Sequence, residues 1–462
     1  MFVNRTKELS WLEERYKKGG SEFIVVYGKR RVGKTELMKQ FFRERPHIFY
    51  LADKRSSQEQ LKDASAIIGR YFEEKFLEFR DWSDVLEYIA TRDKRIVLVI
   101  DEFPYLMEND PAIPSIFQKG WDLHLKNSRI FLMVCGSSIG MMERHVLGYK
   151  SPLYGRRTGQ IHLKPMKPGA MAEYFPGIDV ERFIEFYSIL GGIPAYWRFF
   201  DPKISVMENI KRYIFNKEEP LFGEVDFVLR EEFREPRNYF SILRAISFGK
   251  TRLNDIVQET GLDRGLVSKY LSVLRELHVV VKEVPVTERD PERSRKGLYR
   301  IQENLFKFWF RFVHPNRNYI EEGRPDIPIN EDLKQNLSLF ISFEFENICR
   351  ESLWKIDLPV TFNKLGKWWQ GEEELDIVGL NEKTNDILFA ECKWRNRRTR
   401  MEVAKELLKR SEKVAWRNDV RKEHFIIFSR SGFSSSCRDF CNENNIALLD
   451  LEDVGKSLNI NS

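Results

Sequence analysis

Gly28-Lys-Arg-Arg-Val-Gly33-Lys34-Thr35 is the stretch that decides the fold of the N-terminal part of this 462-residue chain. It matches the pattern G-x-x-x-x-G-K-[ST] of a phosphate-binding loop. The apolar run from Glu22 to Tyr27 predicts a buried strand before the loop, and Glu36 to Phe42 predicts the start of a helix after it. The motif therefore stands in the strand–loop–helix context that it requires, and it predicts an α/β fold.

Each residue of the loop has an expected part in binding ATP. Gly28 and Gly33 let backbone N–H groups turn toward a polyphosphate, and the helix that follows adds the positive end of its dipole. Lys34 is expected to act on the outer phosphates as a catalytic group, and Thr35 to ligate Mg²⁺. The residues predicted to contact ATP in this loop are Gly28, Lys29, Arg30, Arg31, Val32, Gly33, Lys34, Thr35 and Glu36.

A second half of the same site follows Arg95 to Ile100, a run so apolar and β-branched that it predicts a strand buried on both faces. Asp101 and Glu102 come next, at the strand end where ligands bind in α/β sheets. Asp101 is expected to hold Mg²⁺, directly or through water, and Glu102 to polarise the attacking water. An acidic pair that begins an exposed turn is the alternative.

Two further groups are candidates for contact with the terminal phosphate. Ser137, with Ser138 beside it, follows the predicted strand Ile130 to Cys135, and a serine cap of the next helix is the alternative. Arg156 and Arg157 precede the last predicted strand. They are candidate arginine fingers, in cis or toward a neighbouring subunit of a homo-oligomer, with a solvated basic pair as the alternative.

The composition limits what else the chain can be. A hydrophobic content of 42% predicts packed cores, and a net charge of +6 is compatible with a polyanion partner without requiring one. No stretch approaches 18 uncharged apolar residues and the N-terminus lacks the apolar part of a signal peptide, so no membrane partner is expected. The five scattered cysteines predict a reducing, cytoplasmic compartment, and the seven histidines show no metal-ligand spacing.

The pattern along the chain predicts five parts. The first alternates strands and helices, with strands at 23–27, 48–51, 96–100, 130–135 and 160–163. A helical, aromatic-rich segment follows, as a lid over the nucleotide would be. The parts are an ATPase core (1–165), a helical lid (166–235), a winged helix-turn-helix (236–315), a linker rich in Pro, Gly and charge (316–335) and a separate α/β domain (336–462).

The winged helix-turn-helix is predicted from three helical segments and a β-ribbon with a basic tip. The helices are expected at Tyr239–Phe248, Arg252–Thr260 and Leu266–Leu277, the last one capped by Asp263. Residues expected to reach a DNA groove or its phosphates are Ser268, Lys269 and Arg275 on the third helix and Arg293, Arg295 and Lys296 on the wing. A protein–protein module without DNA contact is the alternative.

The C-terminal domain carries a second catalytic candidate. Glu374 to Leu380 and Ile387 to Trp394 predict a hairpin that brings Asp376 near Glu391, and Glu391 and Lys393 share a strand face. Two such carboxylates predict a Mg²⁺ site, and a lysine beside them can orient or deprotonate a water.

Glu346, on a preceding predicted helix, offers a third acid and completes the layout of a PD-(D/E)xK nuclease. Arg397 and Arg398 lie in a basic loop just after this site and can neutralise nucleic-acid phosphates. A solvated basic turn and a degenerate nuclease fold kept for interaction are the alternatives.

Taken together, the motifs resemble one family: the archaeal-type P-loop ATPases with a C-terminal nuclease-like domain. The resemblance runs nearly end to end. Its segments are Phe2–Leu9, Val26–Thr35, Val99–Leu106, Val134–Ser138, Leu153–Gly159, Gly191–Pro194, Tyr299–Phe312 and Phe389–Trp394. It implies an AAA+-related core of the additional-strand, catalytic-glutamate class and a restriction-endonuclease-like C-terminal domain, and it places Arg5 near the nucleotide. It also supports the roles given above to Lys34, Thr35, Asp101, Glu102, Glu346, Asp376, Glu391 and Lys393.

The sequence therefore favours an ATP-binding and ATP-hydrolysing protein that associates with DNA and carries a Mg²⁺-dependent nuclease domain. The alternative is a nucleotide-switched DNA-binding or scaffolding ATPase whose nuclease-like domain does not cleave. RNA as the target and the oligomeric state both stay open at this point.

Overall fold

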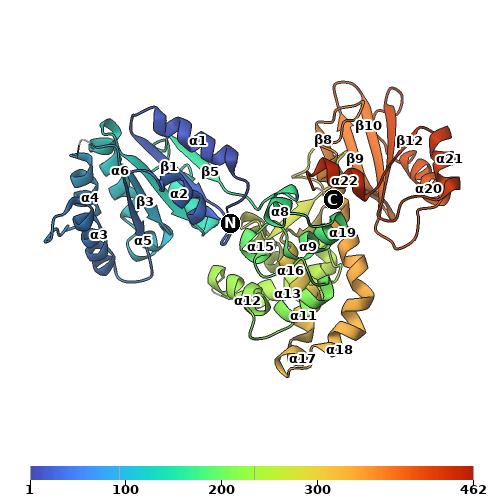
Figure 1. Ribbon diagram of the computed structural model, residues 1–462, viewed down its shortest axis with the longest axis horizontal. Coiled ribbons are helices and arrows are strands. Elements are labelled where there is room, and N and C mark those ends of the chain that lie inside the picture. The colour runs from blue at the N-terminus through green and yellow to red at the C-terminus, as the bar shows by residue number, and fades with distance from the viewer. Residues whose placement is uncertain (1, 93, 234, 461–462) are drawn as a thin grey trace. The chain divides into compact units, whose positions relative to one another are not determined.

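The computed structural model describes residues 2–92, 94–233 and 235–460 (Figure 1). Residues 1, 93, 234, 461 and 462, which fall in the predicted core, lid and C-terminal domain, lie outside the described residues. The chain divides into two compact units. The first runs to Met166 and includes Ile193–Ala195, and the second comprises Lys167–Gly192 and the chain from Tyr196 onward.

The first unit is built on a parallel five-stranded sheet in the order β2-β3-β4-β1-β5. Each of the five predicted strands is confirmed to within one residue at either end. The strands are β1 (Glu22–Tyr27), β2 (His47–Leu51), β3 (Val97–Asp101), β4 (Phe131–Gly136) and β5 (Gly159–His162). All residues of β1, β3 and β4 are buried, as expected of strands that are covered on both faces.

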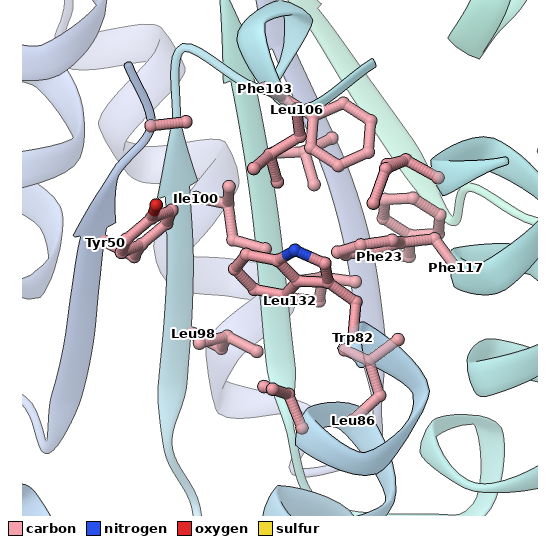
Figure 2. Close-up of a cluster of buried hydrophobic side chains, with 14 of the residues drawn as sticks. Phe23, Tyr50, Trp82, Leu86, Leu98, Ile100, Phe103, Leu106, Phe117 and Leu132 are labelled. Atoms are coloured by element: carbon pink, nitrogen blue, oxygen red, sulfur yellow. The ribbon is translucent and has the colours of Figure 1, made fainter. Parts of the chain in front are cut away.

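Helices cover both faces of this sheet. Their bounds are α1 (Thr6–Lys17), α2 (Lys34–Phe42), α3 (Ser57–Phe72), α4 (Trp82–Ala90), α5 (Pro104–Asn109), α6 (Ile113–Leu123) and α7 (Ile139–Met142). On one face, Trp82 of α4 and Phe117 of α6 pack with the strand residues Leu98, Ile100 and Leu132 (Figure 2). On the other face, rings of α1 and α2 contact Phe131 of β4. This burial fixes the strands that carry the predicted nucleotide site.

The second unit begins with helices and has two sheets, one of two strands and one of five. The helices before residue 235 are α8 (Gly169–Tyr174), α9 (Val180–Leu190), α11 (Val206–Tyr213) and α12 (Pro220–Glu232). Next come α13 (Pro236–Ser247), α14 (Leu253–Thr260) and α15 (Arg264–Glu276), with the antiparallel ribbon β6 (Val280–Glu283) and β7 (Leu298–Ile301). Asp263 caps α15 as predicted, because its Oδ1 accepts from the backbone N–H of Gly265 at 2.7 Å.

Residues 316–335, predicted to be a linker, are largely helical. Their elements are α17 (Arg317–Glu321), α18 (Asp326–Pro328), a π-helical turn (Ile329–Leu333) and the start of α19 (Lys334–Ser352), preceded by α16 (Asn304–Phe308). Ile320, Ile329 and Leu333 are buried. The Pro, Gly and charge content indicated a linker, but these apolar side chains anchor the segment to the second unit.

The C-terminal part is a mixed five-stranded sheet in the order β12-β11-β10-β9-β8. Its strands are β8 (Lys364–Gln370), β9 (Glu373–Asn381), β10 (Asp386–Lys393), β11 (Lys422–Ser429) and β12 (Ile446–Leu449), with α20 (Met401–Ser411), α21 (Ser435–Glu443) and α22 (Leu451–Ser457). β8, β9 and β10 pair antiparallel, whereas β10, β11 and β12 pair parallel. The β9–β10 hairpin was predicted, and its register pairs Ala390 with Ile377.

Candidate nucleotide-binding and acidic sites

The two glycines of the phosphate-binding loop are required for different reasons. Gly28 has φ of +152°, and a Cβ there would lie 2.3 Å from the carbonyl oxygen of Leu163. Gly33 has φ of +97° and caps α2, but a Cβ there would meet nothing within 4 Å. Gly28 therefore permits close backbone packing, and Gly33 permits a left-handed turn beside open space.

Lys34 and Thr35 begin α2 and connect the loop to the acidic strand end. The Nζ of Lys34 donates to the carbonyl oxygens of Gly28 at 3.0 Å and Lys29 at 2.9 Å, and the residue is 5% exposed. Within the described residues Lys34 has no carboxylate partner. Thr35 donates its hydroxyl to Asp101 Oδ2 at 2.6 Å, so the two predicted Mg²⁺ ligands are brought together.

Glu102 follows β3 in a left-handed conformation with φ of +52°, which non-glycine residues seldom adopt. Its Oε2 accepts from the hydroxyl of Ser137 at 2.8 Å and from the Ser137 N–H at 3.2 Å. Ser137 thus holds the predicted catalytic carboxylate, a role that the sequence did not show. Ser138 is the N-cap residue of α7 but its side chain makes no capping hydrogen bond.

The other predicted nucleotide-binding residues surround the loop. The Arg5 guanidinium is buried and donates to the carbonyl oxygens of Lys164 at 2.6 Å and of Val32, inside the loop, at 3.4 Å. Burial lowers the pKa of Arg5 from its ordinary value. Arg30 lies 3.5 Å from the hydroxyl of Tyr105, Arg31 has a left-handed φ of +62°, and Glu36 is exposed in the first turn of α2.

Arg156 and Arg157 are not brought to the loop. They precede β5, whose first residue Gly159 pairs with Ile24 early in β1, whereas Gly28 follows the end of β1. Arg156 forms an ion pair with Asp122 at 2.9 Å, and Arg157 donates to Gln160 at 2.7 Å. These partners speak against an arginine finger in cis, and the role toward a neighbouring subunit stays a prediction.

The C-terminal sheet brings three of the predicted nuclease residues together. Asp376 Oδ2 on β9 accepts from the backbone N–H of Cys392 at 2.8 Å, which places it beside Glu391 on β10. Glu391 is 5% exposed, and its Oε1 accepts from Lys393 and lies 3.5 Å from the guanidinium of Arg410 on α20. The predicted hairpin geometry is therefore confirmed.

Glu391 has an oxygen without a partner. Its Oε2 is buried, and no donor among the described residues reaches it. Burial raises the pKa of the Glu391 carboxyl, with Asp376 adding to the shift and Lys393 opposing it. A buried carboxylate oxygen without a donor costs free energy unless a cation or proton satisfies it.

Glu346 is held by a basic partner in this structure, and its role as a metal ligand stays a prediction. It lies on α19 and forms a buried ion pair with Lys367 of β8. Across the described residues, no group of three or more His, Cys, Asp or Glu side chains is arranged to hold a metal ion. Nothing in the residues around Lys367 predicts this pairing, because lysine side chains are seldom buried.

The predicted DNA-contacting residues are mostly exposed. Ser268 and Lys269 on α15, Arg295 on the ribbon loop and Arg397 and Arg398 after β10 all lie at the surface. Arg275 is half-buried and pairs with Glu292 at 3.3 Å.

Comparisons with known proteins assign the family. Residues 2–198 match an ATPase domain found predominantly in Archaea, and residues 309–407 match a family of archaeal and bacterial proteins of unknown function. The protein MJECL04 of Methanocaldococcus jannaschii is 36% identical over 443 residues, which cover 92% of this chain and 95% of that protein. The chain belongs to this archaeal ATPase family.

Two further relatives agree with the ATPase core. The ATP-binding protein MJ0423 of the same archaeon is 51% identical over 41 residues, which are 9% of this chain and 70% of that protein. The Walker-type ATPase PABY2304 of Pyrococcus abyssi shares the fold over 67% of this chain and 96% of its own, with a TM-score of 0.50 and 22% identity. The protein described here is thus a P-loop ATPase.

Sequence reasoning missed three functional candidates in this ATPase: Lys367, Arg410 and the Ser137–Glu102 contact. Arg410 was not recognised because its spacing from Glu406 on α20 predicts an ordinary i, i+4 ion pair, which the structure shows at 2.8 Å.

None of the helices formed by the described residues has the length and apolar character that crossing a lipid bilayer requires.

Proposed function

We propose that this ATPase acts on nucleic acid, with an Mg²⁺-dependent nuclease site in the C-terminal sheet. The observation that carries the nuclease proposal is the buried, unpartnered Oε2 of Glu391 beside Asp376 and Lys393. A hard divalent cation satisfies such oxygens, and Mg²⁺ is commonly held by one or two carboxylates with waters completing the shell.

At the nucleotide site, the contact of Thr35 with Asp101 fits the Mg²⁺ that accompanies ATP. Mg²⁺ would neutralise charge on the outer phosphates. Lys34 would exchange its carbonyl partners for phosphate oxygens, because a charge-assisted hydrogen bond is stronger than a neutral one. Glu102, oriented by Ser137, would polarise the attacking water.

At the second site, Asp376 and Glu391 would hold Mg²⁺, which would polarise the phosphodiester. Lys393 would orient the attacking water or take its proton. Arg410 contacts the same carboxylate and fixes its orientation. The buried pair of Glu346 with Lys367 adds to the support of this site without binding the ion.

Association with nucleic acid is supported by α13, α14 and α15 with the β6–β7 ribbon, an arrangement that fits the predicted winged helix-turn-helix. Lys269 is exposed on α15, which would be the recognition helix. DNA is the expected partner.

A second candidate function is nucleotide-switched binding without cleavage. Three basic side chains favour it, because they already neutralise the acids of the C-terminal sheet. They are Lys367, Lys393 and Arg410. A site of this kind can be stable without a metal ion.

Incubation of supercoiled plasmid with Mg²⁺ and ATP distinguishes the two functions. The nuclease proposal predicts nicking by the wild type and none by Asp376→Ala or Lys393→Ala. Glu372→Ala, in the exposed turn before β9, is the matched control and should nick normally. Equal nicking by all variants, or plasmid binding without nicking in any, would rule out cleavage at this site.

A further inference from the structure

The loop between β6 and β7, predicted to be the DNA-contacting wing, is docked on the C-terminal sheet. The backbone N–H of Val286 donates to the carbonyl oxygen of Lys367 at 2.9 Å, and Trp369 Nε1 donates to the carbonyl oxygen of Lys296 at 3.2 Å. Val286 also packs against the apolar core of that sheet. A loop held along one side in this way has less freedom to enter a DNA groove.

Acidic neighbours also occupy most of the predicted basic contacts on α15 and the wing. The pairs are Arg275–Glu292 at 3.3 Å, Arg293–Asp290 at 3.6 Å and Lys296–Glu288 at 2.7 Å. A phosphate must displace a carboxylate to reach any of these cations, so part of its electrostatic attraction is lost. The wing is therefore poorly suited to make the main contact with the phosphate backbone of a nucleic acid.

A different surface of the second unit has the surplus of positive charge that the wing lacks. A cavity of about 740 Å³ lies between α12 and α13, with His314 in its wall. Arg230, Arg237 and Arg244 line it, and Glu235 is the carboxylate among its lining residues. We call this surface the arginine cleft.

Among the described residues, two of the three arginines form no ion pair. Arg237 and Arg244 lie seven residues apart on α13, so they share one face about 10 Å apart. In the part of the chain that the structure describes, neither guanidinium makes an ion pair, although Arg244 lies 6.0 Å from the ring of Phe248. Arg230 is bonded to Asp226 at 2.9 Å. Both side chains on α13 are exposed and can reach a bound anion.

The start of α13 connects the cleft to α15. Pro236, the first residue of the helix, has no backbone N–H, and the Glu235 side chain does not cap the N–H groups that follow. Asn238 donates to the hydroxyl of Tyr270 at 2.9 Å, and Lys269 beside it is exposed. A residue that lines the arginine cleft therefore contacts the predicted recognition helix.

We propose that the arginine cleft binds the phosphodiester backbone of a nucleic-acid strand, with Arg237 and Arg244 each contacting a phosphate. This inference rests on the proposed association with nucleic acid and moves its main backbone contact from the wing to α13. Phe240, half-buried and edge-to-face with Trp309 and Phe310, forms part of the apolar wall of the cleft.

Anisotropy titrations of the full chain with a fluorescent DNA oligonucleotide, single-stranded in one arm and duplex in the other, test the cleft at several salt concentrations. Arg237→Ala/Arg244→Ala should weaken binding about 10-fold or more. The slope of the logarithm of the association constant against the logarithm of the salt concentration should become shallower by about 1.4 to 1.8, the value expected for the loss of two phosphate contacts. Arg237→Lys/Arg244→Lys keeps the charge and should retain most of the affinity. Because the cleft lies in the second unit and the ATP site in the first, thermal unfolding of each variant, rather than ATP hydrolysis, reports that the second unit is folded.

Two other double variants make the outcome decisive. Lys62→Ala/Arg70→Ala removes the same charge from α3 and should bind as the wild type does. Arg293→Ala/Arg295→Ala removes the wing charges and should have a smaller effect than the cleft variant. If the cleft variant binds like the α3 control, the cleft proposal is overturned while nucleic-acid association stands. If the wild type binds neither oligonucleotide, both are overturned.

Discussion

In the nucleotide-binding loop, Lys34 is held by two backbone carbonyl oxygens, whereas in the C-terminal sheet Lys367 and Lys393 are held by carboxylates. The acids differ in the same way. Asp101 and Glu102 accept from the hydroxyls of Thr35 and Ser137, while Glu346 and Glu391 accept from basic side chains.

This contrast indicates how each site responds to its ligand. A lysine bound only by neutral carbonyls can turn to a polyphosphate without leaving an unpaired acid behind. A buried acid paired with a lysine is already compensated, and separating the two is costly. The first site is thus ready for an anion, and in the second the unpartnered Oε2 of Glu391, beside Asp376, is the oxygen left open to a cation.

The largest expected effect separates catalysis from binding at the first site. Glu102→Gln keeps the shape and the contact with Ser137 but removes the charge that polarises water. Phosphate release should fall about 100- to 10,000-fold while ATP affinity changes little. Glu108→Gln, on α5, is the control and should hydrolyse ATP normally. A Glu102→Gln enzyme with near-normal turnover would exclude this residue as the base.

The next effect concerns the buried acids of the second site. Burial raises the pKa of Glu346 to about 7, with Asp376 and Glu374 adding and Lys367 opposing. Since an unfolded glutamate titrates near 4.5, the folded chain holds the extra proton between these two values. The stability from Glu346 is therefore full below pH 4.5 and is lost as the pH rises through 7.

Glu346→Gln should remove this part of the pH dependence, which amounts to roughly 3 kcal/mol at most between pH 5 and 8. Denaturant unfolding of the second unit at several pH values measures it. Exposed Glu412→Gln is the control. If the pH profile of Glu346→Gln matches the wild type, Glu346 is not the group that titrates there.

A smaller effect tests the unpartnered oxygen directly. Without nucleotide, Mg²⁺ at ten times its dissociation constant should stabilise the wild type by about 1.4 kcal/mol, because the ion binds only the folded site. Thermal unfolding should show this gain in Asp101→Asn but not in Asp376→Asn. A gain that survives in Asp376→Asn and disappears in Asp101→Asn would place the ion at the other site.

The smallest effect concerns Ser137. Ser137→Ala removes the hydroxyl that bonds Glu102 at 2.8 Å, while the backbone N–H remains. Turnover should fall about 5- to 10-fold, in keeping with one hydrogen bond of about 1 kcal/mol. Ser138→Ala should have no effect. A loss in Ser137→Ala as large as that of Glu102→Gln would mean that Ser137 touches the phosphate itself.

The sequence was sufficient for the parts of these sites that local pattern controls. The loop from Gly28 to Thr35 and the strand ending at Asp101 are each decided by a few neighbouring residues, and parallel strands bring their ends to one edge. Likewise, the short turn between β9 and β10 fixes the register that places Asp376 beside Glu391. The archaeal ATPase match agrees with the core that these patterns predicted.

The remaining contacts depend on which residues meet across long stretches of chain. Lys367 reaches Glu346 across 21 residues, and Ser137 reaches Glu102 across 35, and nothing in either neighbourhood signals these partners. The helices within 316–335 escape composition for a related reason. Composition alone does not reveal that Ile320, Ile329 and Leu333 are buried between helices.

Isothermal titration calorimetry of the folded protein with Mg²⁺–ATP measures nucleotide affinity. It tests most directly whether the first site binds a polyphosphate through Lys34. The wild type should bind one nucleotide. Lys34→Ala should bind at least about 100-fold more weakly, because it lacks the ammonium group that pairs with the phosphates of the nucleotide. Lys39→Ala, one turn further along α2, should bind normally. Equal binding by Lys34→Ala and the wild type would contradict the account.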